Sequence, residues 1–140
     1  MTIRRLVPGD ESIVADLAAE RALTSDEAGA LLADERTFYL VAFEGESPLG
    51  FVFAHELLRR HGDRKQLFVY DLDVTESSRR RGVGTALLRE LERLACTRGI
   101  RTSFVLTNET NQPAMSLYRS LGGVRTNEDD VMWEFELEDR

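Results

Sequence analysis

The feature that most constrains the fold is a strand-like segment that leads through a basic, glycine-containing turn into a long amphipathic segment. Residues 66–74 (QLFVYDLDV) are rich in β-branched and aromatic side chains, which predicts a strand. Residues 82–98 repeat valine and leucine at helical spacing and stop before Gly99, a suitable helix C-terminus. Strict alternation along the strand predicts one face of Leu67, Val69, Asp71 and Asp73, and an opposite face of Phe68, Tyr70, Leu72 and Val74.

The remaining segments predict further strands and helices around this unit. Expected strands are residues 2–6, 37–43, 48–58, 102–107 and 131–137; expected helices are residues 10–23, a second helix from the capping-box sequence 24–27 through residue 32, and 111–121. Residues 59–65 are polar and predict a loop. The order β-α-α-β-β-β-α-β-α-β predicts the α/β class with a mixed sheet, and 140 residues suit a single domain over 1–140.

The composition limits the classes of function that the chain can have. With 18 basic and 25 acidic side chains, the net charge of −7 opposes binding to long nucleic acid and favours a cationic partner. No run reaches the roughly 18 apolar residues of a membrane span, and the first residues lack the apolar core of an export signal. We therefore expect a cytoplasmic protein with no membrane contact. Cys96, His55 and His61 have no zinc spacing and no evident catalytic partner, so we expect structural roles and no metal.

The turn before the long helix has the chemistry of an anion site. Its residues are Arg79, Arg80, Arg81, Gly82, Val83, Gly84 and Thr85. Glycines remove Cβ atoms where a ligand approaches the main chain, and the N–H groups of a helix N-terminus attract negative charge. A diphosphate would fit here. The alternative is a solvated basic turn followed by an ordinary helix cap.

Other polar groups leave two interpretations open. Asp71 and Asp73 interrupt an apolar strand, either to hold a cation or to keep a sheet edge from aggregating. Tyr118, on the helix that Asn111 would cap, is either a core residue or a catalyst. The basic residues of 59–65 either form a solvated tip or contact a ribose phosphate. The acidic C-terminal residues either draw in a polycation or form solvated surface; they are Glu128, Asp129, Asp130, Glu134, Glu136, Glu138 and Asp139.

Two motifs together resemble a known superfamily. R-x-x-G-x-G after a strand, with N-x-x-A-x-x-L-Y-x-x-L-G about thirty residues later, is similar to the GNAT superfamily of N-acetyltransferases. The resemblance implies a central, mostly antiparallel sheet flanked by about four helices, and acetyl-CoA as co-substrate. It implies that residues 79–85 take the pyrophosphate and that main-chain groups of Leu72, Asp73 and Val74 pair with pantetheine. Asn111 would help to fix that arm, and Tyr118 would sit near the sulfur, which it could protonate.

A narrower resemblance rests on three segments. TFYLVAFEGESPLGFVFAHELL, QLFVYDLDVTESSRRRGVGTALLRELERLA and PAMSLYRSLG resemble the class I aminoglycoside 3-N-acetyltransferases. This resemblance implies a homodimer that acetylates the 3-amino group of an aminoglycoside by direct transfer, with Asp71 beside the acceptor amine, and a role in antibiotic resistance. Two alternatives are a GNAT enzyme for another small amine, polyamine or peptide N-terminus, and a non-catalytic acyl-CoA sensor.

Overall fold

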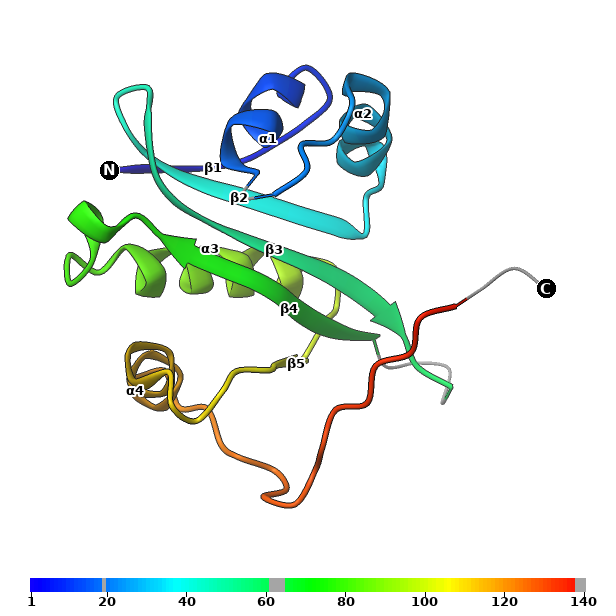
Figure 1. Cartoon of the computed structure of the whole chain (residues 1–140), viewed down its shortest axis with the longest axis vertical. Coiled ribbons are helices and arrows are strands. Elements are labelled where there is room, and N and C mark those ends of the chain that lie inside the picture. Colours follow the sequence, from blue (N-terminus) through cyan, green and yellow to red (C-terminus); the bar gives the residue numbers. More distant parts are fainter. Residues whose placement is uncertain (19, 61–64, 138–140) are drawn as a thin grey trace. The chain divides into compact units, whose positions relative to one another are not determined.

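The computed structural model describes residues 1–18, 20–60 and 65–137, and it holds one five-stranded sheet (Figure 1). The strands are β1 (Thr2–Arg5), β2 (Thr37–Glu44), β3 (Ser47–Leu58), β4 (Lys65–Val74) and β5 (Thr102–Val105). The α-helices are α1 (Glu11–Leu17), α2 (Ser25–Ala33), α3 (Val83–Thr97) and α4 (Gln112–Ser120). The sheet order is β1-β2-β3-β4-β5, with three antiparallel pairs followed by a parallel β4–β5 pair. This confirms the predicted α/β class with a mixed, mostly antiparallel sheet.

The chain divides into two compact units. Met1–Asn108 holds the sheet with α1, α2 and α3, and Glu109–Arg140 holds α4. Within the first unit, α1 and α2 lie over one face of the sheet and α3 lies along the other (Figure 1).

Strand β2 separates two hydrophobic cores. Phe38 and Leu40 belong to the core that includes α3, whereas Tyr39 and Val41 belong to the core that includes α1 and α2. Because β2 is buried on both faces, its sequence is an almost continuous apolar run and not an alternating one.

Helix α3 confirms the predicted helix to within one residue at each end. Its buried side chains recur every fourth residue and face the sheet: Val83, Leu87, Leu91 and Ala95. The helix ends where Gly99 takes a φ of 80°, and the Ile100 N–H donates to the Ala95 carbonyl. A left-handed glycine after the last turn satisfies carbonyls that the helix leaves unpaired.

The predicted helix over residues 10–23 is wrong in its second half. Helix α1 ends at Leu17, and Ala18 is already extended, with a ψ of 126°. Thr24 then starts α2 with the predicted capping box, in which it exchanges hydrogen bonds with Glu27. Leu23 directly precedes this cap and belongs to the same core as Ala28, the pairing of a hydrophobic staple. The chain thus leaves α1 early so that it can turn back and pack α2 on α1.

Strand β4 contains a bulge that overturns the predicted alternation. Phe53 pairs with Asp71 and Ala54 pairs with Val69, so Tyr70 is an extra residue without a partner on β3. The bulge reverses the two faces beyond it. Leu72 and Val74 therefore join Leu67 and Val69 in the core that includes α3. Asp71 and Asp73 lie on the opposite face.

The predicted strand over residues 131–137 is not formed. Strand assignments cover none of these residues, and their apolar side chains are 72–93% exposed: Val131, Met132, Trp133, Phe135 and Leu137. The alternating pattern predicts a strand, but a strand also needs a partner with which to exchange hydrogen bonds. The segment therefore has no regular secondary structure. The predicted helix over residues 111–121 is confirmed as α4.

Two further observations complete the fold. Of the predicted loop over residues 59–65, positions 61–64, including His61, lie outside the described residues, and Lys65 is the first residue of β4. No helix in the described part of the chain is long and apolar enough to cross a membrane.

Candidate functional site

Strands β4 and β5 separate halfway along β4. Their pairing runs from Gln66 with Thr102 to Val69 with Val105 and goes no further. The Thr75 N–H donates to the Leu49 carbonyl of β3 at 2.9 Å. Because main-chain groups alternate in direction along a strand, those of Leu72 and Val74 point away from β3. The separation thus leaves an edge of main-chain donors and acceptors on the side that β5 has left.

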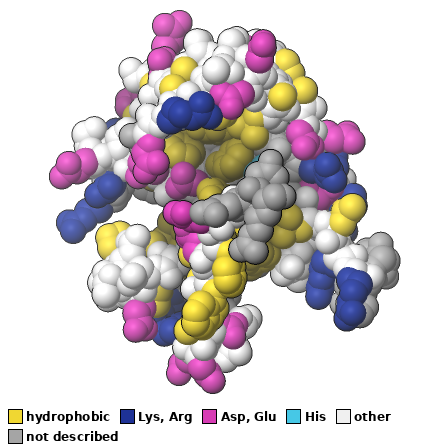
Figure 2. All heavy atoms as spheres, turned by 45° about the vertical axis from the view of Figure 1, so that its right-hand side comes forward, with side chains coloured by type: hydrophobic (Ala, Val, Ile, Leu, Met, Phe, Trp, Pro, Cys, Tyr) yellow, Lys and Arg dark blue, Asp and Glu magenta, His cyan; other side chains and the backbone are white. Residues whose placement is uncertain are grey.

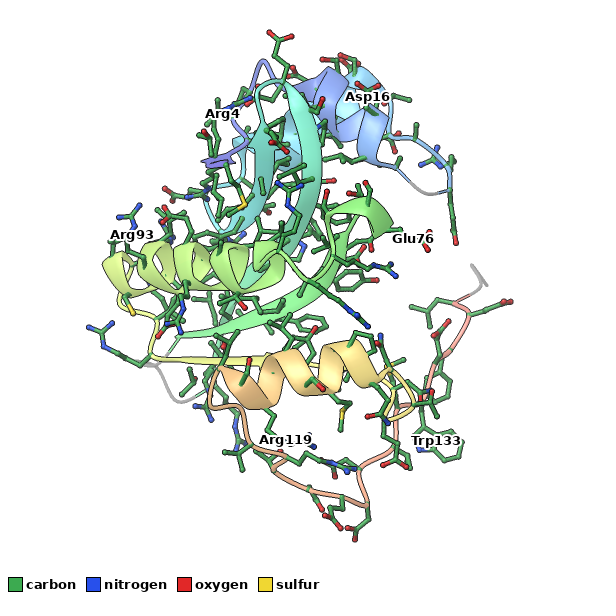
Figure 3. The ribbon with its side chains drawn as sticks, turned by 90° about the vertical axis from the view of Figure 1, so that its left-hand side faces the viewer. Arg4, Asp16, Glu76, Arg93, Arg119 and Trp133 are labelled. Atoms are coloured by element: carbon green, nitrogen blue, oxygen red, sulfur yellow. The ribbon has the colours of Figure 1, made fainter. Side chains whose placement is uncertain are left out.

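The turn that follows β4 is held by two hydroxyl groups. Thr75 Oγ1 donates to Ser78 Oγ at 2.8 Å, and the Ser78 N–H donates to the Thr75 carbonyl at 2.9 Å. Ser78 is only 3% exposed, so these bonds fix the short 3-10 helix η1 (Glu76–Ser78) against the sheet. Glu76, on this turn, is labelled in Figure 3.

The main chain then takes two left-handed conformations before α3 begins. Arg80 has a φ of 64° and Gly82, which caps α3, has a φ of 77°. No side chain caps the helix, and no acidic residue lies in its first turn. The N–H groups of Val83, Gly84 and Thr85 therefore form the start of a helix whose positive end lacks a neutralising carboxylate. This is the geometry of an anion site.

The arginines of the turn are exposed and make exchangeable contacts. Arg79 Nε donates to the Val74 carbonyl at 3.2 Å, and Arg81 Nη2 lies 3.2 Å from Glu44 Oε2 at the end of β2. Both partners of the Arg81–Glu44 pair are more than half exposed, so the pair contributes little to stability. An anion could take over either arginine at small cost.

The carboxylates of Asp71 and Asp73 lie side by side on the face of β4 opposite α3. Burial raises the pKa of Asp71 above its ordinary value, and the charge of Asp73 raises it further, against the Leu72 N–H, which lowers it. Across the strand, Asp71 is paired with Phe53 and Asp73 with Phe51. The site therefore combines negative charge with an apolar floor formed by Phe51 and Phe53. This combination suits a cation with an apolar carbon skeleton.

The sequence analysis missed Tyr39 on that floor. Its side chain is 8% exposed, and its ring centroid lies 5.6 Å from Phe51 and 5.3 Å from Phe53. Burial and the charge of Asp71 raise the pKa of Tyr39 to about 12. Figure 2 shows hydrophobic side chains lining a hollow in the upper part of the molecule, with both acidic and basic side chains around it. In the sequence, Tyr39 lies within a continuous apolar run, so the pattern does not mark it as a site residue.

Two predicted site residues belong to the second unit. Asn111 Oδ1 accepts a hydrogen bond from the Ala114 N–H at 3.2 Å and so caps α4 as predicted. Tyr118 is half-buried in the same helix, and the Gly123 N–H donates to its carbonyl at 2.9 Å. The position of either side chain beside β4 stays a prediction.

The other candidate side chains have structural surroundings. His55 Nδ1 lies 3.3 Å from Thr37 Oγ1, and its ring meets Phe53 edge-on at 4.8 Å. Cys96 is an exposed thiol on α3. Among the described residues no three His, Cys, Asp or Glu side chains gather as metal ligands would.

A pocket of about 430 Å³ lies away from β4. It is lined by Thr2, Arg4, Ile13, Asp16, Phe43, Gly45, Glu46 and Pro48, of which Arg4 and Asp16 are labelled in Figure 3. Arg4 is already paired with Asp10 at 2.8 Å. The pocket includes neither the open edge of β4 nor the turn before α3, so it is not part of the candidate site.

The comparison with known families assigns the chain to one class of proteins, the acetyltransferases. The chain belongs to the acetyltransferase (GNAT) family, whose sequence model matches residues 9–123. It is 31% identical over 97 residues to N-acetyltransferase 8 of Rattus norvegicus. The match covers 69% of this chain but 44% of that relative, so the chain spans less than half of the relative's length.

Two solved structures have closely similar folds. One is an aminoglycoside acetyltransferase, HMB0005, from an uncultured soil metagenomic sample, with a TM-score of 0.88 and 25% identity over 98% of each chain. The other is the aminoglycoside acetyltransferase meta-AAC0020, also from an uncultured soil metagenomic sample, in complex with sisomicin. It has a TM-score of 0.83 and 20% identity, and the alignment covers 99% of this chain and 96% of that one.

Proposed function

We propose that this chain is an acetyl-CoA-dependent N-acetyltransferase that acetylates an amine of an aminoglycoside. We propose that the 3-amino group of the aminoglycoside receives the acetyl group. The observation that carries the proposal is the opening between β4 and β5 next to the N-terminus of α3, which has no side-chain cap. Because the family match runs from residue 9 to residue 123, across both compact units, we also propose that they form a single acetyltransferase domain.

The residues of the opening fit acetyl-CoA in chemistry. The pyrophosphate is placed at the N–H groups of residues 83–85, where Arg79, Arg80 and Arg81 add positive charge. The amide groups of pantetheine are placed along the outward main-chain groups of Leu72 and Val74, as a further strand would be. When bound, acetyl-CoA supplies an acetyl group activated as a thioester.

The carboxylate face accounts for the acceptor half of the reaction. An ammonium group must lose a proton before its nitrogen can attack, and Asp71 is placed to accept that proton. A raised pKa makes Asp71 a stronger base than an ordinary carboxylate. Asp73 adds a second negative charge that attracts a cationic amine.

The proton that the departing sulfur needs is assigned to Tyr118. As the new N–C bond forms, the C–S bond breaks and the departing sulfur gains an electron pair. The Tyr118 hydroxyl is assigned to donate a proton to this sulfur. The nitrogen, which gave its first proton to Asp71, releases its second proton as the amide forms, and that proton restores the Tyr118 hydroxyl. Main-chain N–H groups at the β4 bulge are assigned to stabilise the charge that develops on the carbonyl oxygen. Asn111 is assigned to hold the pantetheine arm through its side-chain NH₂.

Two observations support an aminoglycoside as the acceptor. The aminoglycoside acetyltransferase HMB0005 is 25% identical and is matched over 98% of each chain. In addition, the chain has a net charge of −7, which favours a multiply charged cation. The 31% identity to an N-acetyltransferase whose name specifies no aminoglycoside favours a second candidate, an enzyme for another small amine or a peptide N-terminus.

The coenzyme half can be tested by calorimetry with a size series at position 84. Gly84→Val should abolish acetyl-CoA binding, because a branched side chain fills space next to the helix N-terminus, whereas Gly84→Ala should keep part of it. Both variants should remain folded, because alanine and valine are at least as compatible with a helix as glycine. Unchanged affinity in Gly84→Val contradicts the placement of the pyrophosphate.

The acceptor half can be tested by thiol release from acetyl-CoA with a panel of amines. Release with gentamicin-type aminoglycosides supports the proposal. Release only with polyamines, simple amines or peptide N-termini supports the second candidate. Binding of acetyl-CoA without release by any amine indicates an acyl-CoA sensor.

A further inference from the structure

The bulge in β4 places two consecutive side chains, Tyr70 and Asp71, on the same face of the sheet. In a regular strand, neighbours point to opposite faces. Here the Tyr70 ring lies 6.1 Å from the Phe53 ring, edge-on, and 5.4 Å from the Phe68 ring. Phe53 is also the cross-strand partner of Asp71. An aromatic ring and a carboxylate therefore stand side by side.

A second observation confirms the side on which Asp71 lies. The charge of Asp71 contributes to the raised pKa of Tyr39, and Tyr39 packs against Phe53 at 5.3 Å. The Tyr70 and Asp71 side chains thus belong to one aromatic floor that continues along β4 to Phe68.

Tyr70 is the exposed member of this floor. Its side chain is 64% exposed, although its ring is in edge-to-face arrangement with those of Phe53 and Phe68. It also stands one residue beyond Val69, where the pairing between β4 and β5 ends. An exposed aromatic ring at this point is available to a molecule whose amine is held by Asp71.

We propose that Tyr70 determines specificity by contacting the ring carbons of a cyclic amine acceptor while Asp71 holds the ammonium group of the same molecule. The inference rests on the proposed function and names its substrate class, a saturated ring that bears amino groups. Charge complementarity selects the cation, because Asp71 and Asp73 follow Tyr70 on the same face of β4. The aromatic face adds contact with the C–H groups of the acceptor ring, which an open-chain amine of equal charge cannot match.

The test compares two diamines with the same spacing of nitrogens. One is 2-deoxystreptamine, the cyclitol of many aminoglycosides, in which the nitrogens are joined through three ring carbons. The other is 1,3-diaminopropane, which keeps that spacing without the ring. Binding of each to the full chain is measured by saturation-transfer NMR and calorimetry, and turnover is measured by thiol release with acetyl-CoA.

The variants separate the ring of Tyr70 from its hydroxyl and from general loss of apolar surface. Tyr70→Ala should weaken 2-deoxystreptamine about two- to tenfold, the scale of one aromatic contact, and leave 1,3-diaminopropane unchanged. Tyr70→Phe should behave as the parent, and Tyr70→Leu should behave as Tyr70→Ala. Leu58→Ala is the matched control, since Leu58 is 71% exposed at the end of β3 and belongs to neither hydrophobic core.

The outcomes distinguish this inference from the proposed function. If Tyr70→Ala affects both diamines equally, or neither, the role of Tyr70 is overturned even when the parent enzyme turns over. If the ring preference depends on Tyr70 in the binding measurements but no amine gives thiol release, the binding role of Tyr70 holds and the proposed function fails. A parent that binds the open-chain diamine as tightly as the cyclic one also overturns the inference.

Discussion

Gly50 of β3 lies directly against the main chain of Asp73 of β4. A Cβ atom at position 50 would stand 2.7 Å from the Asp73 carbonyl oxygen and 3.1 Å from the Val74 Cα. Both neighbours are main-chain atoms, so they cannot swing aside as a flexible side chain would. Glycine at this position sets how closely β3 holds the end of β4 that leads into the turn before α3.

Gly50→Ala should therefore disturb the site from a distance. The added methyl group pushes β4 away from β3, and we expect a loss of about 1–3 kcal/mol in the free energy of unfolding. Acetyl-CoA affinity should fall as well. Gly29→Ala is the matched control, because position 29 lies within α2 and its Cβ would meet only Glu11 Oε1, at 3.4 Å. The control should gain up to about 1 kcal/mol, and equal effects of the two substitutions would contradict this account.

The contact of Arg81 with Glu44 should compete with the coenzyme. Glu44→Gln releases Arg81 from a surface ion pair, so acetyl-CoA affinity should rise by about two- to fivefold at low salt. Arg81→Ala should lower the affinity and flatten its salt dependence. Arg93→Ala, which breaks the pair with Glu90 on the outer side of α3 (Figure 3), should leave the affinity unchanged. Calorimetry over a salt series measures all three, and a fall in affinity for Glu44→Gln would refute competition.

Asp71→Asn should stabilise the fold while it impairs the enzyme. Because the pKa of Asp71 is raised in the folded chain, ionising Asp71 at neutral pH costs more free energy in the folded state than in the unfolded state. Removing the charge should therefore raise the melting temperature at pH 7. The gain should shrink as pH falls through the folded-state pKa toward the ordinary carboxyl pKa, since Asp71 is then protonated in both states.

Asp10→Asn is the control of opposite sign. Burial by itself raises the pKa of Asp10, but the contacts with the Val7 N–H and Arg4 outweigh burial and lower this pKa below its ordinary value. Ionised Asp10 therefore stabilises the fold at neutral pH, and its contribution is lost as pH falls through the lowered pKa. Thermal melts from pH 7 to pH 4 should show opposite shifts for the two variants. A lower melting temperature for Asp71→Asn at pH 7 would refute the assignment.

Tyr118→Phe should separate chemistry from binding. The substitution removes only the hydroxyl, so turnover should fall on the order of 10²-fold while acetyl-CoA affinity stays near that of the parent. Tyr70→Phe serves as the matched control, since its hydroxyl has no assigned proton to donate. Single-turnover kinetics make the comparison where chemistry limits the rate. Parental rates in Tyr118→Phe would reduce Tyr118 to a packing residue.

Several local elements of the fold could be predicted from the sequence. Helix α3, the Thr24 capping box and the turn before α3 follow from local patterns, which depend on neighbouring residues alone. The bulge at Tyr70 could not be predicted in this way, because it depends on how β4 pairs with β3. One extra residue moved Asp71 and Asp73 to the aromatic face, which the alternating pattern had assigned to their neighbours. The C-terminal pattern over residues 131–137 similarly could not show whether a partner strand exists.

The central claim is that an amine held at Asp71 receives an acetyl group from acetyl-CoA bound along β4. The most direct measurement is NMR analysis of the product formed from a gentamicin-type aminoglycoside and acetyl-CoA, with the parent and with Asp71→Asn. The account predicts one acetyl group on the 3-amine, a severe loss of product with Asp71→Asn, and raised tolerance to the drug in a susceptible bacterium that expresses the parent chain. A parent that binds acetyl-CoA yet yields no acetylated aminoglycoside would contradict it.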